Sequence, residues 1–207
     1  MRGWYIEKGP ESDVVISSRV RVARNLKDIP FPIKMDKEQA KMVVNRVKEA
    51  VETEKSELAK GLLFLDLKTF DPIDRNALVE KHLISPELAE VKMENAVIIS
   101  RDEKISIMIN EEDHLRIQTM FSGMQVRNAW QLCEKVDEML EEKLDFAFDK
   151  TYGYLTCCPT NLGTGIRASV MLHLPALVMT GYISNILEAC TKLGMAVRGI
   201  YGENSEA

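Results

Sequence analysis

Apolar and polar positions divide the chain into alternating runs and helix-like blocks. Residues 14–24, VVISSRVRVAR, begin as a β-branched run and end in alternation, which predicts a strand or extended arm. The apolar runs at 95–101 and 104–110 are separated by Asp102 and Glu103, a pattern typical of a β-hairpin. Further strands are predicted over 61–67, within 111–121, and over 152–157, 166–174 and 196–202, the first of them short and buried.

Helical spacing marks the remaining segments. Residues 35–60 offer Asp36 as N-cap, followed by apolar residues at 42, 43, 47 and 51, which predicts a surface helix. Another helix is expected from Asp71-Pro72 to about residue 82, and Ser85-Pro86 opens a short helical turn. The strongest helical pattern lies over 123–145, and a last helix is predicted over 175–194 with Pro175 near its first turn.

Two cysteines fall inside these predicted helices. Cys133 shares a stripe with Trp130 and Val136 and is assigned to the core, and Cys190 is expected to be buried in an apolar helix face. Strands joined by hairpins and interrupted by long helices favour an α+β fold, a mostly antiparallel sheet with helices packed on one face. No repeat or Pro/Gly/Ser-rich linker divides the 207 residues, so a single domain is expected.

Composition narrows the function classes. The net charge of -5 argues against a partner such as bulk nucleic acid or an anionic membrane, so any anion site must be a local group of arginines. No apolar run reaches the length of a membrane span and no signal-peptide core precedes the domain, which predicts a cytoplasmic protein. The four cysteines form no CxxC pair, which argues against a zinc site or disulfide framework and favours reduced thiols.

The first candidate cluster lies in SSRVRVARN. On an extended chain Arg19 and Arg21 point to the same side, where two guanidinium groups can grip a polyphosphate. The alternative is a solvated edge strand whose charges discourage aggregation.

The second cluster is NEEDHLR, residues 110–116. Three consecutive acids at a strand exit can hold a cationic substrate or bind magnesium through water, and Arg116 can reach a phosphate; a polar turn is the alternative. His114 is expected to be a structural hydrogen-bonding histidine, and His82 and His173 show no partner pattern.

The third cluster is the loop CCPTNLGTGIR, residues 157–167. Its small residues let backbone N–H groups approach an anion, although it lacks the pattern of a Walker loop. Arg167 adds a guanidinium at the loop exit, and Cys158 at the loop start would be a candidate thiolate near these cations.

Together, SSRVRVARN, NEEDHLR and CPTNLGTGIRASV resemble the phosphagen (guanidino) kinase superfamily, and most closely its bacterial protein arginine kinase branch. The resemblance implies a glutamine-synthetase-like catalytic domain, ATP and Mg²⁺ as cofactors, and phosphoryl transfer to a guanidinium nitrogen. It implies that ATP is bound by Ser18, Arg19, Arg21, Arg116, Arg167 and Arg198. It also implies that Glu112, Cys158 and Glu206 form the catalytic acceptor site, and that Glu111 and Asp113 support magnesium through water.

The resemblance further implies protein substrates with exposed arginines, marked for Clp-dependent degradation in the stress response. The partners it implies are the McsA activator, the CtsR repressor and ClpC, and it leaves a homodimer open. Residues 1–207 would form a catalytic domain incomplete at its C-terminus, without an N-terminal helical lid domain, so the acceptor site is expected to be open. The alternatives are an inactive kinase-derived binding module, a kinase of a free guanidino compound, and a thiol enzyme built on Cys158.

Overall fold

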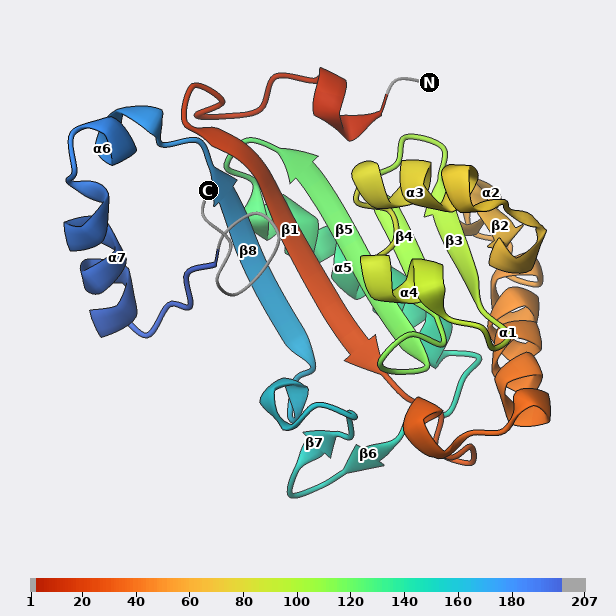
Figure 1. The fold of residues 1–207 in the computed structure, drawn as a ribbon. Helices are drawn as coiled ribbons and strands as arrows, with labels where there is room; N and C mark the ends of the chain where they lie inside the picture. The colour runs from red at the N-terminus through yellow and green to blue at the C-terminus, as the bar shows by residue number, and fades with distance from the viewer. Residues whose placement is uncertain (1–2, 199–207) are drawn as a thin grey trace.

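The computed structural model describes residues 3–198, which form a twisted six-stranded sheet with helices on both faces (Figure 1). The strand order is β2-β3-β4-β5-β1-β8, and all five pairings are antiparallel. The sheet strands are β1 (Val15–Arg24), β2 (Leu62–Asp66), β3 (Ala96–Ser100), β4 (Ile105–Ile109), β5 (Leu115–Ser122) and β8 (Ile166–Leu172); β6 (Phe148–Asp149) and β7 (Gly153–Tyr154) form a separate two-stranded ribbon. The predicted antiparallel α+β fold is confirmed.

The helices divide between the two faces of this sheet. The α-helices are α1 (Lys37–Glu52), α2 (Glu57–Lys60), α3 (Pro72–Glu80), α4 (Pro86–Glu90), α5 (Val126–Glu141), α6 (Pro175–Met179) and α7 (Ile183–Lys192), and the short 3₁₀ turns are Trp4–Ile6, Pro32–Lys34, Leu67–Thr69 and Pro159–Asn161. Helices α1 and α5 enclose the main core, and α3 and α4 cover β3 and β4 from the opposite side with a smaller one. The prediction that helices pack on one face only is therefore wrong, because an apolar stripe shows that a helix is buried but not against which face.

Local chemistry explains where several elements begin. The side chain of Asp36 accepts from the N–H of Gln39, whose side chain accepts in turn from the N–H of Asp36, and this capping box starts α1. Asp71 and Ser85 cap α3 and α4 in the same position, each before a proline in the first turn. At the β4–β5 turn Asn110 adopts a φ of 61°, a left-handed conformation that asparagine tolerates better than most residues.

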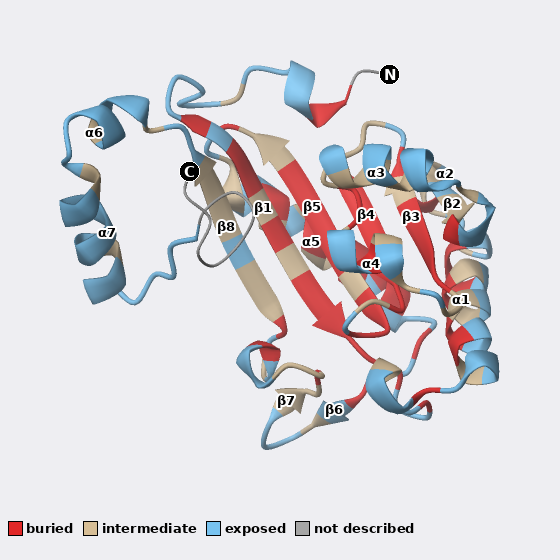
Figure 2. Ribbon diagram, in the orientation of Figure 1, coloured by how far each residue is buried: buried red, intermediate tan, exposed pale blue. Residues whose placement is uncertain are grey.

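Burial follows the strands of the central sheet (Figure 2). Side chains of β1, β4 and β5 that face α5 are almost inaccessible, and the predicted core residue Cys133 is 0% exposed. Strand β2 is instead a half-buried edge strand, so its prediction as a short buried strand is right in length and wrong in burial.

The C-terminal part departs most from the predictions. The helix expected over 175–194 is two helices, because the chain turns at Gly181 with a φ of 73°. Neither α6 nor α7 contains a buried residue, and Cys190 is half-buried rather than buried. Only two residues of the strand predicted over 152–157 pair as β7. Of the strand predicted over 196–202, residues 196–198 lie outside any strand, and the rest lies outside the described residues.

Candidate functional site

Arginines from three neighbouring strands meet on the sheet face that points away from α5. Arg19 and Arg21 alternate along β1 with apolar residues that pack on α5, so both side chains project to the opposite face. The register places Arg21 opposite Arg167 of β8 and opposite Gln118 of β5. Arg116 shares a face with Gln118, two residues away, and thus lies diagonally from Arg21. We call Arg19, Arg21, Arg116 and Arg167 the arginine cluster.

Burial, together with mutual repulsion, makes it unfavourable for the arginines of this cluster to be charged. Burial lowers the pKa of Arg21 from 12.5 to about 9, and the positive charges of the other three arginines act in the same direction, opposed by Glu111. Burial also lowers the pKa of Arg19, again with help from Arg116 and Arg167. Positive charges held together in this way favour binding of a polyanion, which would relieve the repulsion.

Two carboxylates hold one end of the arginine cluster. Arg116 donates to Glu111 at 2.7 Å through Nη1 and to Glu112 at 3.1 Å through Nη2. The side chain of Glu111 is 3% exposed and also accepts from Ser85, and burial raises its pKa. The side chain of Glu112 is 43% exposed, so it can contact a molecule arriving from solvent.

Asp113 turns inward, away from this surface. It is 1% exposed, and its Oδ1 accepts from Nδ2 of Asn25 at 2.6 Å and from the N–H of Cys157 at 2.7 Å. The geometry therefore gives no support to Asp113 as a carrier of magnesium-bound water. Among residues 3–198, no group of three or more His, Cys, Asp or Glu side chains is arranged to hold a metal ion.

His114 has the structural role that the sequence predicts. Its Nδ1 accepts from the N–H of Leu26 at 3.0 Å, and its Nε2 donates to the carbonyl oxygen of Pro30 at 2.9 Å. This pair of contacts requires the neutral ring with the proton on Nε2, and burial lowers the pKa of His114 in the same sense.

The cysteine loop lies next to the acidic turn. Because the N–H of Cys157 is bound to Asp113, Cys158 is held close to the turn that carries Glu112. The Sγ of Cys158 lies 3.0 Å from Oγ1 of Thr160, in the 3₁₀ turn that follows. Burial, helped by the negative charges of Asp113 and Glu112, raises the pKa of the Cys157 thiol to about 12. The Cys157 thiol is therefore unreactive at neutral pH.

Three other site residues were predicted from the sequence: Ser18, Arg198 and Glu206. The Ser18 side chain is on the α5 side of β1, where it donates to the carbonyl oxygen of Gly123 at 2.7 Å and accepts from the N–H of Gln125 at 2.8 Å, so the structure gives its predicted ATP contact no support. Arg198 is exposed and follows α7 outside any helix or strand, and its role in ATP binding stays a prediction. Glu206 lies outside the described residues.

Sequence reasoning missed His82, which lies beside the arginine cluster. Burial lowers the pKa of His82, and the charge of Arg19 lowers it further. Its carbonyl oxygen accepts from Nε2 of Gln118 at 2.6 Å, which ties the end of α3 to β5. No local motif marks a histidine of this kind, because only the packing of α3 on the sheet brings it to the site.

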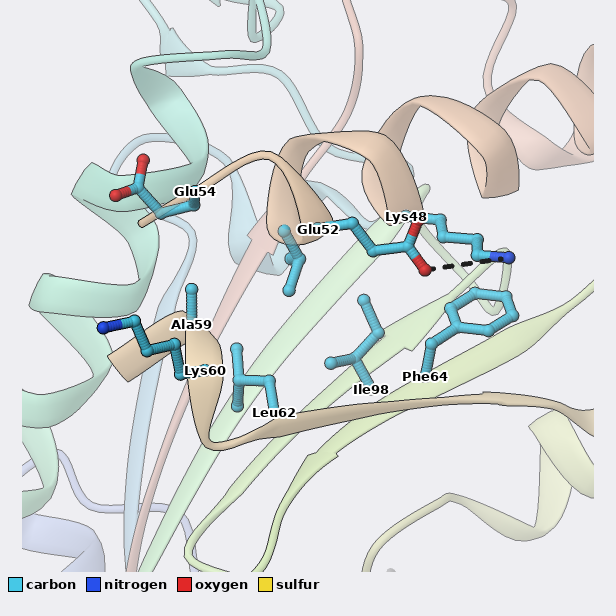
Figure 3. Close-up of a pocket in the computed structure, with 9 residues that line it drawn as sticks. Lys48, Glu52, Glu54, Ala59, Lys60, Leu62, Phe64 and Ile98 are labelled. Carbon is cyan, nitrogen blue, oxygen red and sulfur yellow. Dashed lines mark ion pairs between the residues drawn. The ribbon is translucent and has the colours of Figure 1, made fainter. Parts of the chain in front are cut away.

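Two cavities lie on the other side of the sheet. One of about 220 Å³ opens between α1, α2 and β2, where Lys48 pairs with Glu52 at 3.8 Å and lies over the ring of Phe64 (Figure 3). The other, of about 580 Å³, lies beside α5 and the β6–β7 ribbon and includes Asp137 and Tyr154 in its lining. Neither lining includes a described residue of the predicted site, and the predicted phosphate-binding arginines Arg19, Arg21, Arg116 and Arg167 lie together on the opposite face of the sheet.

Comparison with known proteins identifies the family of this chain. Residues 42–207 match the model of the ATP:guanido phosphotransferase C-terminal catalytic domain. The chain belongs to the ATP:guanido phosphotransferase family. This confirms the resemblance to guanidino kinases, and the family's reaction uses ATP. Among the described residues, none of the helices combines the length and apolar character that crossing a bilayer requires.

Relatives that are similar to this chain in sequence include bacterial protein-arginine kinases. The chain is 52% identical over 204 residues to a protein-arginine kinase of Brevibacillus brevis, covering 99% of this chain and 57% of the relative. It is 53% identical over 205 residues to a protein-arginine kinase of Moorella thermoacetica, covering 99% of this chain and 59% of the relative. The chain thus spans less than two thirds of the length of these relatives.

Solved guanidino kinases share the fold. The duplicated taurocyamine kinase of Schistosoma mansoni with bound transition-state analogue components superimposes with a TM-score of 0.86 at 27% identity, covering 96% of this chain and 29% of that one. A lombricine kinase gives a TM-score of 0.80 at 23% identity over 95% of this chain and 57% of that one, a likeness that supports the fold alone.

Proposed function

We propose that this chain carries the phosphotransfer site of an ATP-dependent protein arginine kinase, which transfers the γ-phosphoryl group of ATP to the guanidinium group of arginine side chains in proteins. The observation that carries the proposal is the arginine cluster next to the exposed carboxylate of Glu112. The arginine cluster suits the polyphosphate of ATP, and the Glu112 carboxylate suits a cationic guanidinium. The reaction requires these two substrates to be bound close to each other.

On the donor side, the arginine cluster binds the phosphates of ATP. Phosphoryl transfer passes through a loose transition state that is stabilised by positioning and by opposite charge, and the guanidinium groups of the cluster supply both. His82, which lies near enough to Arg19 to be affected by its charge, is proposed to contact the nucleotide at the edge of the cluster. Magnesium would be bound by the phosphates of ATP and neutralise part of their charge.

On the acceptor side, Glu112 and Cys158 hold the guanidinium of the substrate. An arginine guanidinium is protonated at neutral pH and is a poor nucleophile, so one of its nitrogens must be oriented and must release a proton. A P–N bond then forms, the P–O bond to ADP breaks, and the proton of the attacking nitrogen passes to the carboxylate of Glu112. Glu112 accepts hydrogen bonds from the guanidinium, and Glu206 is proposed as a second carboxylate.

A protein acceptor is favoured over a free guanidino compound because the acceptor side is open. Besides the exposed Glu112, Pro159 and Thr160 next to Cys158 are exposed, which leaves room for an arginine carried on a polypeptide. The bacterial relatives named above are called protein-arginine kinases. A cytoplasmic location, the marking of proteins for Clp-dependent degradation and partners of the McsA, CtsR and ClpC type are part of this proposal.

The test is incubation of the chain with Mg-ATP and an unfolded arginine-containing protein, followed by mass spectrometry for acid-labile phosphoarginine. Glu112→Gln and Cys158→Ala should each lower the rate by on the order of a hundredfold, as loss of a single group at a charge-stabilising site does. Glu142→Gln and Cys190→Ala, at positions outside the site, are the matched controls. The same assay with free arginine as the acceptor distinguishes a protein substrate from a free guanidino compound, because only a kinase of the free compound should phosphorylate it. ATP binding without any phosphorylated product would contradict the proposal and point to a binding module.

A further inference from the structure

The amide side chain of Asn25 lies where three segments of the candidate site meet. Asn25 directly follows β1 and is 1% exposed. Its Nδ2 donates to Oδ1 of Asp113 at 2.6 Å and to the carbonyl oxygen of Leu155 at 3.1 Å. Its Oδ1 accepts from the N–H of His114 at 2.9 Å. One side chain thus joins the end of the arginine-bearing strand to the acidic turn and to the segment that leads to Cys158.

Asp113 extends this network to both groups of the acceptor side. The same Oδ1 that accepts from Asn25 accepts from the N–H of Cys157 at 2.7 Å. Glu112 precedes Asp113 in the chain and Cys158 follows Cys157, so this oxygen atom connects the two residues that flank the acceptor. The network is buried, and a lost contact would leave a polar group without a partner.

We propose that Asn25 is a positioning residue of the phosphotransfer site: through Asp113 it fixes the separation of Glu112 and Cys158, and with it the place of the acceptor guanidinium. The proposal rests on the proposed function, which assigns Glu112 and Cys158 to the acceptor. Asn25 itself touches no reacting group. Its effect on rate comes from geometry, since a misplacement of about 1 Å costs on the order of a hundredfold.

Asn25→Asp is the most selective perturbation, because it exchanges one NH₂ group for an oxygen of similar size. The variant keeps an acceptor for the N–H of His114 but places a carboxylate against Asp113, where a donor stood. We expect kcat for phosphoarginine formation to fall on the order of a hundredfold. The KM for ATP should stay within about threefold, because the arginine cluster is untouched. Asn45→Asp, the same exchange at an exposed position of α1, should change neither parameter.

A double-mutant cycle separates positioning from a general loss of structure. Asn25→Asp and Asp113→Asn each disturb the contact at Oδ1 of Asp113, the atom that also accepts from the N–H of Cys157. If Asn25 acts through Asp113, the two losses of kcat should be non-additive, and the double variant should be at least about tenfold more active than the product of the single effects predicts. The proposal would be overturned by additive losses, or by an Asn25→Asp variant that folds and keeps kcat within about threefold of the wild type.

Thiol labelling gives a readout that does not require activity. With its anchor to Asp113 weakened, Cys157 should react with iodoacetamide several-fold faster in Asn25→Asp, relative to Cys190 in the same molecule. If the wild-type chain forms no phosphoarginine, the proposed function fails. The labelling ratio then decides by itself whether Asn25 holds the cysteine segment, and an unchanged ratio would refute that role.

Discussion

Replacement of Arg21 by glutamine should make the ligand-free protein more stable while it weakens ATP binding. The pKa of Arg21 falls from 12.5 to about 9, and because one pKa unit corresponds to about 1.4 kcal/mol, the folded state disfavours the charged side chain by about 5 kcal/mol. Water still reaches part of the guanidinium, and glutamine loses both the attraction to Glu111 and some packing. We therefore expect a net gain of about 1–2 kcal/mol, or a rise in Tm of about 3–6 °C.

The stability difference between Arg21→Gln and the wild type should depend on pH. Because the pKa of Arg21 is lower in the folded than in the unfolded state, the unfolded chain binds more protons between pH 9 and the ordinary arginine value, and wild-type stability rises with pH in that window. Below pH 9 Arg21 is charged in both states, and the full cost of burying its charge lowers the stability of the folded protein. The advantage of Arg21→Gln should therefore be largest near pH 7 and shrink toward pH 10, and 1 M salt should reduce its repulsive part.

Thermal unfolding of wild type, Arg21→Gln and Arg101→Gln, with and without ATP, tests both halves of the prediction. Arg101 is exposed in the β3–β4 turn, so its replacement should leave Tm unchanged. ATP should raise the Tm of the wild type and of Arg101→Gln, but raise that of Arg21→Gln much less. If Arg21→Gln melts at or below the wild-type Tm at pH 7, the picture of a strained cluster of like charges is refuted.

Three further experiments test other parts of the protein. Asp137→Ala should lower the free energy of unfolding in urea by about 3–5 kcal/mol, because it removes the carboxylate that lies 2.6 Å from the buried guanidinium of Arg24; an unchanged midpoint would contradict this. Gly165 has a φ of 70°, and a Cβ added there would lie 2.7 Å from a carbonyl oxygen of β1, so Gly165→Ala should lower the free energy of unfolding by about 2 kcal/mol or more. Gly181 has a φ of 73° but no atom within 4 Å of such a Cβ, so Gly181→Ala should lower it less. Peptide mapping after iodoacetamide treatment at pH 8 should find Cys157 largely unmodified, and rapid labelling would show that its thiol is not as shielded as its pKa of about 12 implies.

The sequence predicted those parts of the site that depend on local chemistry. Alternation along residues 14–24 was enough to place Arg19 and Arg21 on one face, because the side-chain direction in a strand has a period of two. Asp36 marked the start of α1 because its side chain bonds within its own first turn. These interactions span only a few residues, so they can be predicted from the sequence alone.

Contacts between distant residues were out of reach of the sequence. Asn25 and Asp113 are far apart in the chain, and both carry short polar side chains that suit an exposed turn equally well. The assignment of Asp113 to magnesium followed its acidic neighbours, although its carboxylate turns inward. The break at Gly181 was missed because helical spacing continues on both sides of it, and one glycine within such a pattern does not show whether the helix stops.

Strand β1 tolerates changes of residue type better than changes of length, because its two faces have different roles. Val20 and Val22 pack into the main core while Arg19 and Arg21 form the arginine cluster, and both sets are defined by odd or even position alone. Insertion or deletion of one residue within the strand would move guanidinium groups into the core and valines onto the binding face. Such a chain would lose its fold together with its site. A screen for soluble expression should therefore remove length variants of β1 before any assay of activity, while tolerating many substitutions there that abolish function.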